Sequence, residues 1–367
     1  MIKRTVLLIL LLSSLTRYEN FIIAQKTEHQ NLFLESKFQY GFIWQHKPSL
    51  EEVIGGNIKV FDIALGKQTY GEKYWEQLYR YPSYGFGYTF VDFGNPEELG
   101  MANALFAYVD IPFFRKNKHM LSYRISGGLA YLNQGNIAIG THLNLYFDAM
   151  INYRYRLSKR LDLINGFGAT HFSNGAVKMP NLGINMFSYR IGLHYRLNTT
   201  EREFVKHELP KIMKKNSFSF LFATGIKEKR PEGGIAYNVF SFSTDYLRVL
   251  SLKHKLGLGL DAFYDESLFE TMNPDSSLNL TTSDIMRYGV HLAFEAEFSK
   301  IMLAVHLGTY LYAKYKEDGA IYERVAIRYL ISKNLYANIS LKTSKGVADY
   351  TEFGLGYRFY WKKQEQL

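Results

Sequence analysis

The feature that most constrains this chain is an alternation of apolar and polar residues with a period of two, which recurs along most of its length. In residues 285–298, one face of an extended chain would be apolar or aromatic, carrying Met286, Tyr288, Val290, Leu292, Phe294, Ala296 and Phe298. The other face would be charged or small, carrying Arg287, Gly289, His291, Ala293, Glu295 and Glu297. Residues 351–361 repeat the pattern. Strands of this kind are typical of a wall between lipid and a polar lumen.

The same period predicts extended segments of about ten residues, separated by polar turns. They lie near residues 32–44, 56–66, 83–92, 100–113, 119–132, 143–157, 160–173, 184–197, 215–227, 235–249, 254–268, 283–298, 300–314, 321–332, 334–344 and 350–361. Because the edges of a sheet cannot face hydrocarbon unpaired, these strands must close on themselves. We therefore predict an all-β protein, an antiparallel transmembrane β-barrel of about 12–16 strands.

Composition favours a barrel over a helical membrane protein or a soluble sandwich. The 367 residues include 29 tyrosines and 27 phenylalanines but no cysteine. No run of about 18 apolar residues follows the N-terminal segment. A soluble sandwich would also alternate, but it would rarely combine so many aromatic residues with so many strands. Tyr310, Tyr312, Tyr357 and Trp361 stand near strand ends, where an interfacial aromatic girdle is expected.

The N-terminus is typical of an exported protein. Lys3 and Arg4 precede a short apolar run over residues 5–15, which is shorter than the about 20 residues that a spanning helix needs. We predict a signal peptide over residues 1–24, cleaved between Ala24 and Gln25. Export combined with a barrel implies the bacterial outer membrane.

A polar segment without alternation, residues 198–214, divides the strands into residues 25–197 and residues 215–367. It could be a long turn, a linker between two barrels or a short surface helix. The role of the strands in residues 215–367 stays open. If the first strand starts in the periplasm, an even strand count returns the segment there and places the turn after residue 173 outside the cell.

The chain is basic, with a formal net charge of +10. Basic proteins attract nucleic acids or anionic lipids. Since an exported chain rarely meets nucleic acid, we expect anionic lipid headgroups as the partner and no nucleic acid. Exposed lysines near the outer rim, such as Lys178, would be placed to meet phosphates.

Polar residues that could carry chemistry lie on the apolar face of two successive predicted strands. In residues 160–173, His171 and Ser173 share a face with leucines and a phenylalanine, and the next strand places Asn185 beside Phe187. All three side chains would face lipid near the outer ends of their strands, where a hairpin would bring them together. Polar groups in lipid are costly unless they have partners, so a cluster suggests a purpose.

The chemistry that fits these side chains is nucleophilic catalysis. A serine becomes a nucleophile when a histidine takes its proton, and a third side chain fixes the tautomer of the imidazole. Gly175, or a backbone amide near Asn174, could stabilise an oxyanion. From the residues alone, the alternative is a polar loop at a barrel rim with an interfacial histidine and serine.

A resemblance to a known family sharpens this choice. The run His171-Phe172-Ser173-Asn174-Gly175, followed by Pro180-Asn181-Leu182-Gly183-Ile184, resembles the signature of the outer-membrane lipid A 3-O-deacylases, the PagL family. The resemblance implies that His171 is the base and Ser173 the nucleophile, with Asn174, Gly175, Pro180, Asn181 and Gly183 as supporting residues of the motif. In the family a glutamate orients the histidine, and its position is occupied here by Asn185.

That departure has a parallel in outer-membrane phospholipase A. The His-x-Ser-Asn-Gly run is similar to the motif of that enzyme, which orients its histidine with an asparagine at the same spacing but lacks the Pro-Asn-x-Gly-Ile segment. The expected function is a serine hydrolase that removes an ester-linked acyl chain from lipid A or lipopolysaccharide. The alternatives are a phospholipase A acting on phospholipid, or a barrel that serves as a pore or structural protein. A homodimer is left open.

No cofactor is expected, except Ca²⁺ if the phospholipase parallel is the truer one. The ten histidines show no zinc-binding spacing. His291 and His306 lie on the less apolar faces of their strands and are expected in the lumen. We expect Glu295 and Glu297 there too, paired with arginines such as Arg287.

Overall fold

The computed structural model describes residues 31–198, 203–209, 215–229, 234–273, 277, 279–315 and 319–362. The predicted signal peptide, residues 1–24, lies outside the described residues. Of the dividing segment, residues 203–209 are described, and they have no regular secondary structure. Of the three alternatives for this segment, the short helix is not seen in residues 203–209.

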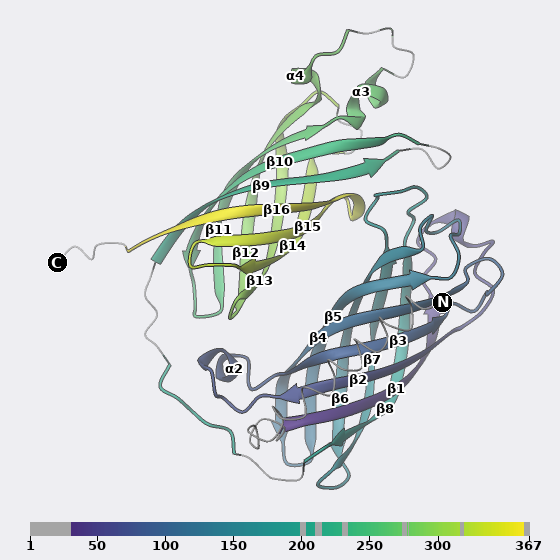
Figure 1. Ribbon diagram of the computed structural model, residues 1–367, viewed down its shortest axis with the longest axis vertical. Coiled ribbons are helices and arrows are strands. Elements are labelled where there is room, and N and C mark those ends of the chain that lie inside the picture. Colours follow the sequence, from purple (N-terminus) through teal and green to yellow (C-terminus); the bar gives the residue numbers. More distant parts are fainter. Residues whose placement is uncertain are drawn as a thin grey trace, which may run out of the picture.

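Sixteen strands are described, and they close into two separate eight-stranded barrels (Figure 1). The first barrel comprises β1 (Leu32–Ile43), β2 (Ile58–Gln68), β3 (Ser83–Asp92), β4 (Met101–Lys116), β5 (His119–Leu132), β6 (Leu143–Arg156), β7 (Leu161–Ser173) and β8 (Ile184–Arg196). The second comprises β9 (Lys215–Glu228), β10 (Ala236–Val249), β11 (His254–Asp265), β12 (Met286–Phe298), β13 (Ile301–Ala313), β14 (Ile321–Leu330), β15 (Leu335–Ser344) and β16 (Val347–Lys362). The predicted all-β antiparallel barrel fold is confirmed.

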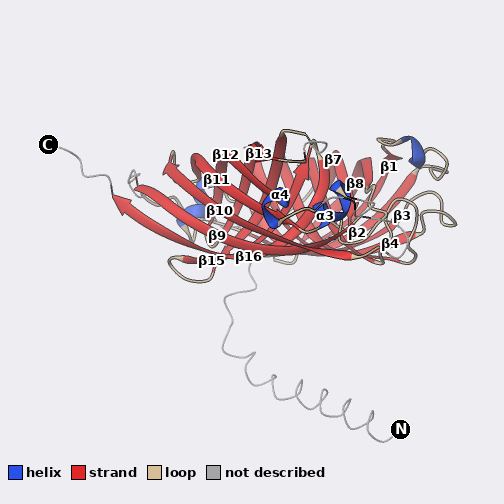
Figure 2. Cartoon of the chain, turned by 90° about the horizontal axis from the view of Figure 1, so that it is seen from above, coloured by secondary structure: helices blue, strands red, loops and turns tan. Residues whose placement is uncertain are grey.

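Each barrel closes by pairing its first strand with its last. β1 pairs with β8, and β9 pairs with β16, both antiparallel. Strands make up most of the molecule in Figure 2, and helices are confined to the connections. These are η3 (Pro48–Leu50), α2 (Tyr74–Leu78), α3 (Ser267–Met272) and α4 (Thr282–Ile285). No helix in the described ranges is long and apolar enough to cross a membrane.

The strand faces follow the alternation in the sequence. In β12, Arg287, His291 and Glu295 are buried in the lumen, whereas Leu292 and Phe294 are exposed on the outer wall. Exposed leucine, phenylalanine and tyrosine side chains cover the outside of both barrels. So large a contiguous apolar surface is unfavourable in water, and it is typical of the lipid-facing wall of a membrane barrel. The outer walls therefore face lipid.

The aromatic girdle is present only in part. Tyr312 and Tyr357 are exposed on the outer wall. Tyr310 instead packs inside, with ring centroids 4.8 Å from Tyr322 and 6.0 Å from Phe263. The expectation for Tyr310 was wrong because the even-numbered residues of β13 up to this point face the lumen. The side chain of Trp361 lies outside the described part of the structure.

The lumen of the first barrel contains buried ion pairs. Arg124 reaches Glu35 at 2.7 Å and Asp110 at 2.8 Å, and Arg190 reaches Asp148 at 3.0 Å. All five side chains are buried. An eight-stranded barrel has an interior that side chains can just fill, so this barrel is a packed body rather than a channel.

The lumen of the second barrel is built in the same way. Glu295 pairs with Arg358 at 2.7 Å and with Arg328 at 3.2 Å. The expected pairing of Glu295 with Arg287 was wrong, because both belong to β12 and eight residues of strand separate them by about 26 Å. Arg287 pairs instead with Asp265 of β11 at 3.0 Å.

The two barrels touch at both ends. At one end the ring of Tyr79 stacks on Phe298 with centroids 4.2 Å apart, and its hydroxyl donates to the carbonyl of Glu297 at 3.0 Å. Burial raises the pKa of Tyr79, which keeps this hydroxyl a neutral donor. At the other end, the backbone N–H of Met179 donates to the Glu228 carboxylate at 2.7 Å. The second barrel therefore reaches the turn between β7 and β8.

Removing the central cation of the first lumen should destabilise the barrel. Arg124→Ala is expected to lower the free energy of unfolding by about 3 kcal/mol, because Asp110 has its only ion pair within the described residues with Arg124. Urea titration of the refolded barrel, read by heat-modifiable mobility on gels, measures this. The control is Lys59→Ala at an exposed position of β2, and equal loss in both variants would contradict the prediction.

Candidate active site

The strand register brings a histidine and an asparagine together on the outer wall. His171 of β7 lies directly opposite Asn185 of β8, and His171 Nδ1 is 2.6 Å from Asn185 Oδ1. The neighbouring residues Thr170, Phe172 and Met186 are buried in the lumen, so His171 and Asn185 point away from it. The histidine therefore has a hydrogen-bonded partner on the lipid-facing side.

Ser173 ends β7 on the same face as His171 and is buried, with 3% of its surface exposed. Its Oγ donates to Asn181 Oδ1 at 3.2 Å and accepts a hydrogen bond from the Gly175 N–H at 3.0 Å. Among the hydrogen bonds of the described residues, none joins Ser173 to His171. A hydrogen bond from Ser173 to His171 would have to replace the one that Ser173 donates to Asn181.

The residue between them anchors the strand from inside. Phe172 is fully buried, and its ring meets Phe93 edge-on at 5.4 Å and Tyr146 at 5.3 Å. These rings belong to the large apolar cluster of buried residues in the first barrel. The His-x-Ser spacing therefore places one large apolar side chain in the core while its two polar neighbours face outward.

The turn after Ser173 is held by its own asparagines. Asn181 Oδ1 accepts from the backbone N–H of Asn174 at 3.0 Å, and the Asn174 side chain donates to the carbonyl of Lys178 at 2.6 Å. Gly140, in the connection from β5 to β6, donates its N–H to the carbonyl of Pro180 at 2.8 Å. The predicted motif residues thus fix the shape of the loop that covers Ser173.

Two glycines in this turn have positive φ angles, +66° at Gly175 and +75° at Gly183. A side chain at Gly183 would also stand 3.0 Å from His171 Cε1, so glycine leaves room for the imidazole. A side chain at Gly175 would stand 2.0 Å from Thr351 Oγ1 of the second barrel. Glycine is therefore needed at both positions for space as well as for backbone conformation.

An apolar groove runs along the outer wall beside the pair of polar residues. Phe167 and Ala169 of β7 and Phe187 and Tyr189 of β8 help to line it. The register pairs Ala169 with Phe187 and Phe167 with Tyr189. These pairs follow the His171–Asn185 pair along the same face of the two strands.

Three contacts of the site were missed from the sequence. His46, in the connection after β1, lies with Nδ1 3.2 Å from Asn185 Nδ2. Two further contacts come from the second barrel. The Glu228 carboxylate accepts a hydrogen bond from the Met179 N–H at 2.7 Å, and the Thr351 hydroxyl lies 3.5 Å from the carbonyl oxygen of Gly175. No spacing rule links residues this far apart in the chain, so only the folded structure reveals them.

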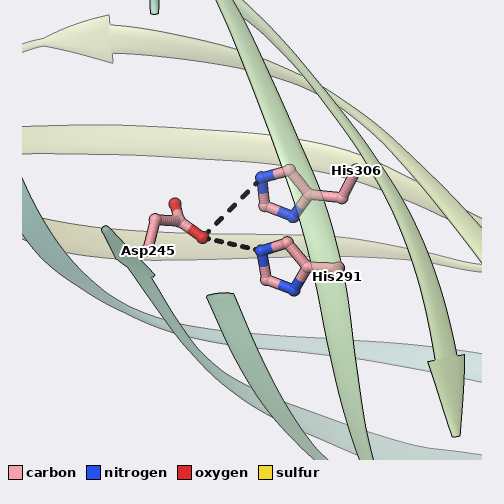
Figure 3. A group of neighbouring side chains, drawn as sticks. All are labelled: Asp245, His291 and His306. Atoms are coloured by element: carbon pink, nitrogen blue, oxygen red, sulfur yellow. Dashed lines mark hydrogen bonds and ion pairs between the residues drawn. The ribbon is translucent and has the colours of Figure 1, made fainter. Parts of the chain in front are cut away.

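In the described part of the chain, Asp245, His291 and His306 lie close enough to share a metal ion, inside the second barrel (Figure 3). His291 Nε2 is already 2.9 Å from Asp245. Arg328 lies 3.1 Å from Asp245 and 3.4 Å from His306 Nε2. Since a guanidinium repels a cation and occupies the lone pairs that an ion would need, we assign this group to the packing of the lumen.

A closed antiparallel barrel with an apolar outer wall and a polar lumen defines a class, the membrane-embedded β-barrel proteins. Residues 60–194 match the family model of the lipid A 3-O-deacylases (PagL), and residues 216–361 match that of the acyloxyacyl hydrolase C-terminal domain. Between them the matches take in more than half of the chain, so it belongs to the lipid A 3-O-deacylase family. The protein is thus an outer-membrane ester hydrolase, and the predicted membership of this family is confirmed.

Two solved structures align with the chain at low sequence identity and low TM-score. The crystal structure of the outer membrane enzyme PagL aligns over 43% of this chain and 97% of its own, with 18% identity and a TM-score of 0.30. A triple mutant of Rhodopseudomonas blastica porin aligns over 89% of this chain and 99% of its own, with 8% identity and a TM-score of 0.18. No curated protein matches the chain. The family assignment therefore rests on the two family models.

The anchor beneath the site gives a testable consequence. Phe172→Ala should lower the free energy of unfolding by about 3–5 kcal/mol, because it opens a cavity between Phe93 and Tyr146. The matched control is Phe167→Ala on the same strand, whose ring is 61% exposed to the outside. Denaturant titrations of both variants compare the two, and an equal effect would show that Phe172 is not a core anchor.

Proposed function

We propose that this protein is a serine hydrolase that removes an ester-linked acyl chain from lipid A. Ser173 is the nucleophile, His171 the general base and Asn185 the residue that orients the imidazole. The observation that carries the proposal is the 2.6 Å contact between His171 Nδ1 and Asn185 Oδ1 on the lipid-facing wall. Membership of the deacylase family supports the substrate.

The chemistry follows from that contact. An amide oxygen only accepts hydrogen bonds, so His171 donates its Nδ1 proton to it and keeps a lone pair on Nε2. Nε2 takes the proton of Ser173 as Oγ bonds to the ester carbonyl carbon. It then returns the proton to the leaving alkoxide as the ester C–O bond breaks. Water hydrolyses the acyl-enzyme by the same route.

The backbone beside the serine offers a donor for the developing negative charge. The Gly175 N–H lies 3.0 Å from Ser173 Oγ, close to where the oxygen of the attacked carbonyl group would lie. The N–H of Asn174 is engaged with Asn181 at 3.0 Å. The sequence left both amides as candidates. We favour Gly175 for stabilising the oxyanion, because its N–H points at Ser173 Oγ.

The lipid-facing position suits a substrate that is itself part of the bilayer. An acyl chain can reach the site by lateral diffusion and lie against Ala169 and Phe187 in the outer groove. Lys178 is exposed in the turn above the site, where it can meet a phosphate of the headgroup. We expect no cofactor, because the proposed steps use only protein side chains and water.

A phospholipase A remains the second candidate, and Asn185 favours it. The family places a glutamate at this position, whereas the resembling phospholipase uses an asparagine. Phospholipids would approach along the same outer groove, and Ca²⁺ would then be tested as a cofactor. The packed lumens do not favour a pore.

The test uses two substitutions in the full chain. Ser173→Ala and His171→Ala should each lower the rate of acyl release from lipid A by at least about 10²-fold, because they remove the nucleophile or its base. Mass spectrometry of lipid A incubated with the refolded protein measures the loss of one acyl chain. The control is His119→Ala, an exposed histidine at the other end of the barrel.

Each outcome separates the candidates. Release of fatty acid from phospholipid but not from lipid A would favour the phospholipase and overturn our choice of substrate. Lipid A cleavage that persists in both Ser173→Ala and His171→Ala would overturn the serine mechanism. Heat-modifiable mobility confirms that each variant is folded.

A further inference from the structure

An asparagine that orients a catalytic histidine poses a problem that a glutamate does not. The two ends of an amide differ, because Oδ1 accepts hydrogen bonds and Nδ2 donates them. Turned the other way, Asn185 would donate to His171 Nδ1, and the imidazole proton would then sit on Nε2. Such a histidine could not accept the proton of Ser173.

We propose that His46 holds the amide of Asn185 in the productive orientation and so sets the tautomer of His171. His46 is a positioning residue, since it acts through Asn185. The inference rests on the proposed serine mechanism and extends it. His46 lies outside the two segments matched by the family models.

The backbone brings His46 to the site. Trp44 follows the end of β1 and donates its N–H to the carbonyl of Asn185 at 2.8 Å, which continues the pairing of β1 with β8. His46 therefore lies next to the Asn185 side chain. Asn185 Nδ2 is 3.2 Å from His46 Nδ1 and 3.4 Å from His46 Nε2.

The hydrogen bonds of His46 indicate which of its nitrogens accepts. Nε2 lies 2.9 Å from the carbonyl of Leu182, and Nδ1 lies 3.1 Å from the carbonyl of Trp44. Carbonyls only accept, so they compete for the single ring proton of a neutral imidazole. The shorter contact assigns the proton to Nε2, which leaves the Nδ1 lone pair for Asn185 Nδ2.

The result is a directed chain of hydrogen bonds. His46 Nε2–H donates to Leu182, Asn185 Nδ2 donates to His46 Nδ1, and His171 Nδ1–H donates to Asn185 Oδ1. Reversing the amide would place two acceptors, Asn185 Oδ1 and His46 Nδ1, against one another. The ring proton would have to move to Nδ1 to relieve this, at the expense of the Leu182 contact. The chain thus favours the one orientation that keeps His171 a base.

A double-mutant cycle tests this role. His46→Ala should lower kcat for acyl release about fivefold with little change in KM, the loss expected for one hydrogen bond. In the Asn185→Glu background, His46→Ala should lower kcat by less than about twofold, because a carboxylate has two equivalent acceptor oxygens and needs no orienting partner. His119→Ala serves as the control in both backgrounds.

A second comparison uses the acceptor alone. His46→Asn places an amide oxygen near the former position of Nδ1 and should retain most of the activity that His46→Ala loses. If Asn185→Glu alone is inactive, the double-mutant cycle cannot be measured, and the comparison of His46→Asn with His46→Ala tests the role of His46 instead. Equal activity of His46→Asn and His46→Ala would then overturn the proposal.

The remaining outcomes are distinct. If His46→Ala costs the same factor in both backgrounds, His46 supports the loop through Leu182 and does not orient Asn185. If His46→Ala has no effect in the wild-type background, the inference is also overturned. If the wild-type protein itself shows no serine-dependent hydrolysis, the proposed function fails rather than the role of His46.

Discussion

The register between β7 and β8 is the constraint on which the rest of the site depends. It sets His171 opposite Asn185 and pairs the groove residues below them. A slip of one residue would turn every side chain of one strand to the other face, placing His171 in the lumen. Phe172 opposes such a slip, because a large ring buried between Phe93 and Tyr146 cannot be exchanged for an imidazole without loss of packing.

The filled lumens give that register a rigid support. Paired arginines and carboxylates cross-link strands far apart in sequence, as Arg124 joins β5 to Glu35 of β1 and Asp110 of β4. Such charges are expensive to bury and more expensive to leave unpaired, so they resist local opening of the wall. Because packed side chains fill the lumen, the proposed catalytic residues lie on the outer wall.

The second barrel has a direct relation to the site. Its first and last strands contribute Glu228 and Thr351, which contact the turn that follows Ser173. The turn is therefore enclosed by two barrels rather than left as a free loop. This arrangement offers one physical reason for a hydrolase to carry a second barrel with a packed lumen.

Much of this could be predicted from the sequence, because alternation with a period of two reports directly which face each side chain occupies. It determined the barrel fold, the approximate strands and the outward position of His171, Ser173 and Asn185. The alternation does not show which strands pair to close a barrel. It is therefore the same for two eight-stranded barrels as for one larger barrel. The contacts of His46 and Glu228, the hydrogen bond of Ser173 to Asn181 and the inward turn of Tyr310 were decided by the tertiary structure. They depend on loops and on strands distant in sequence, whose distances are fixed only when each sheet closes on itself.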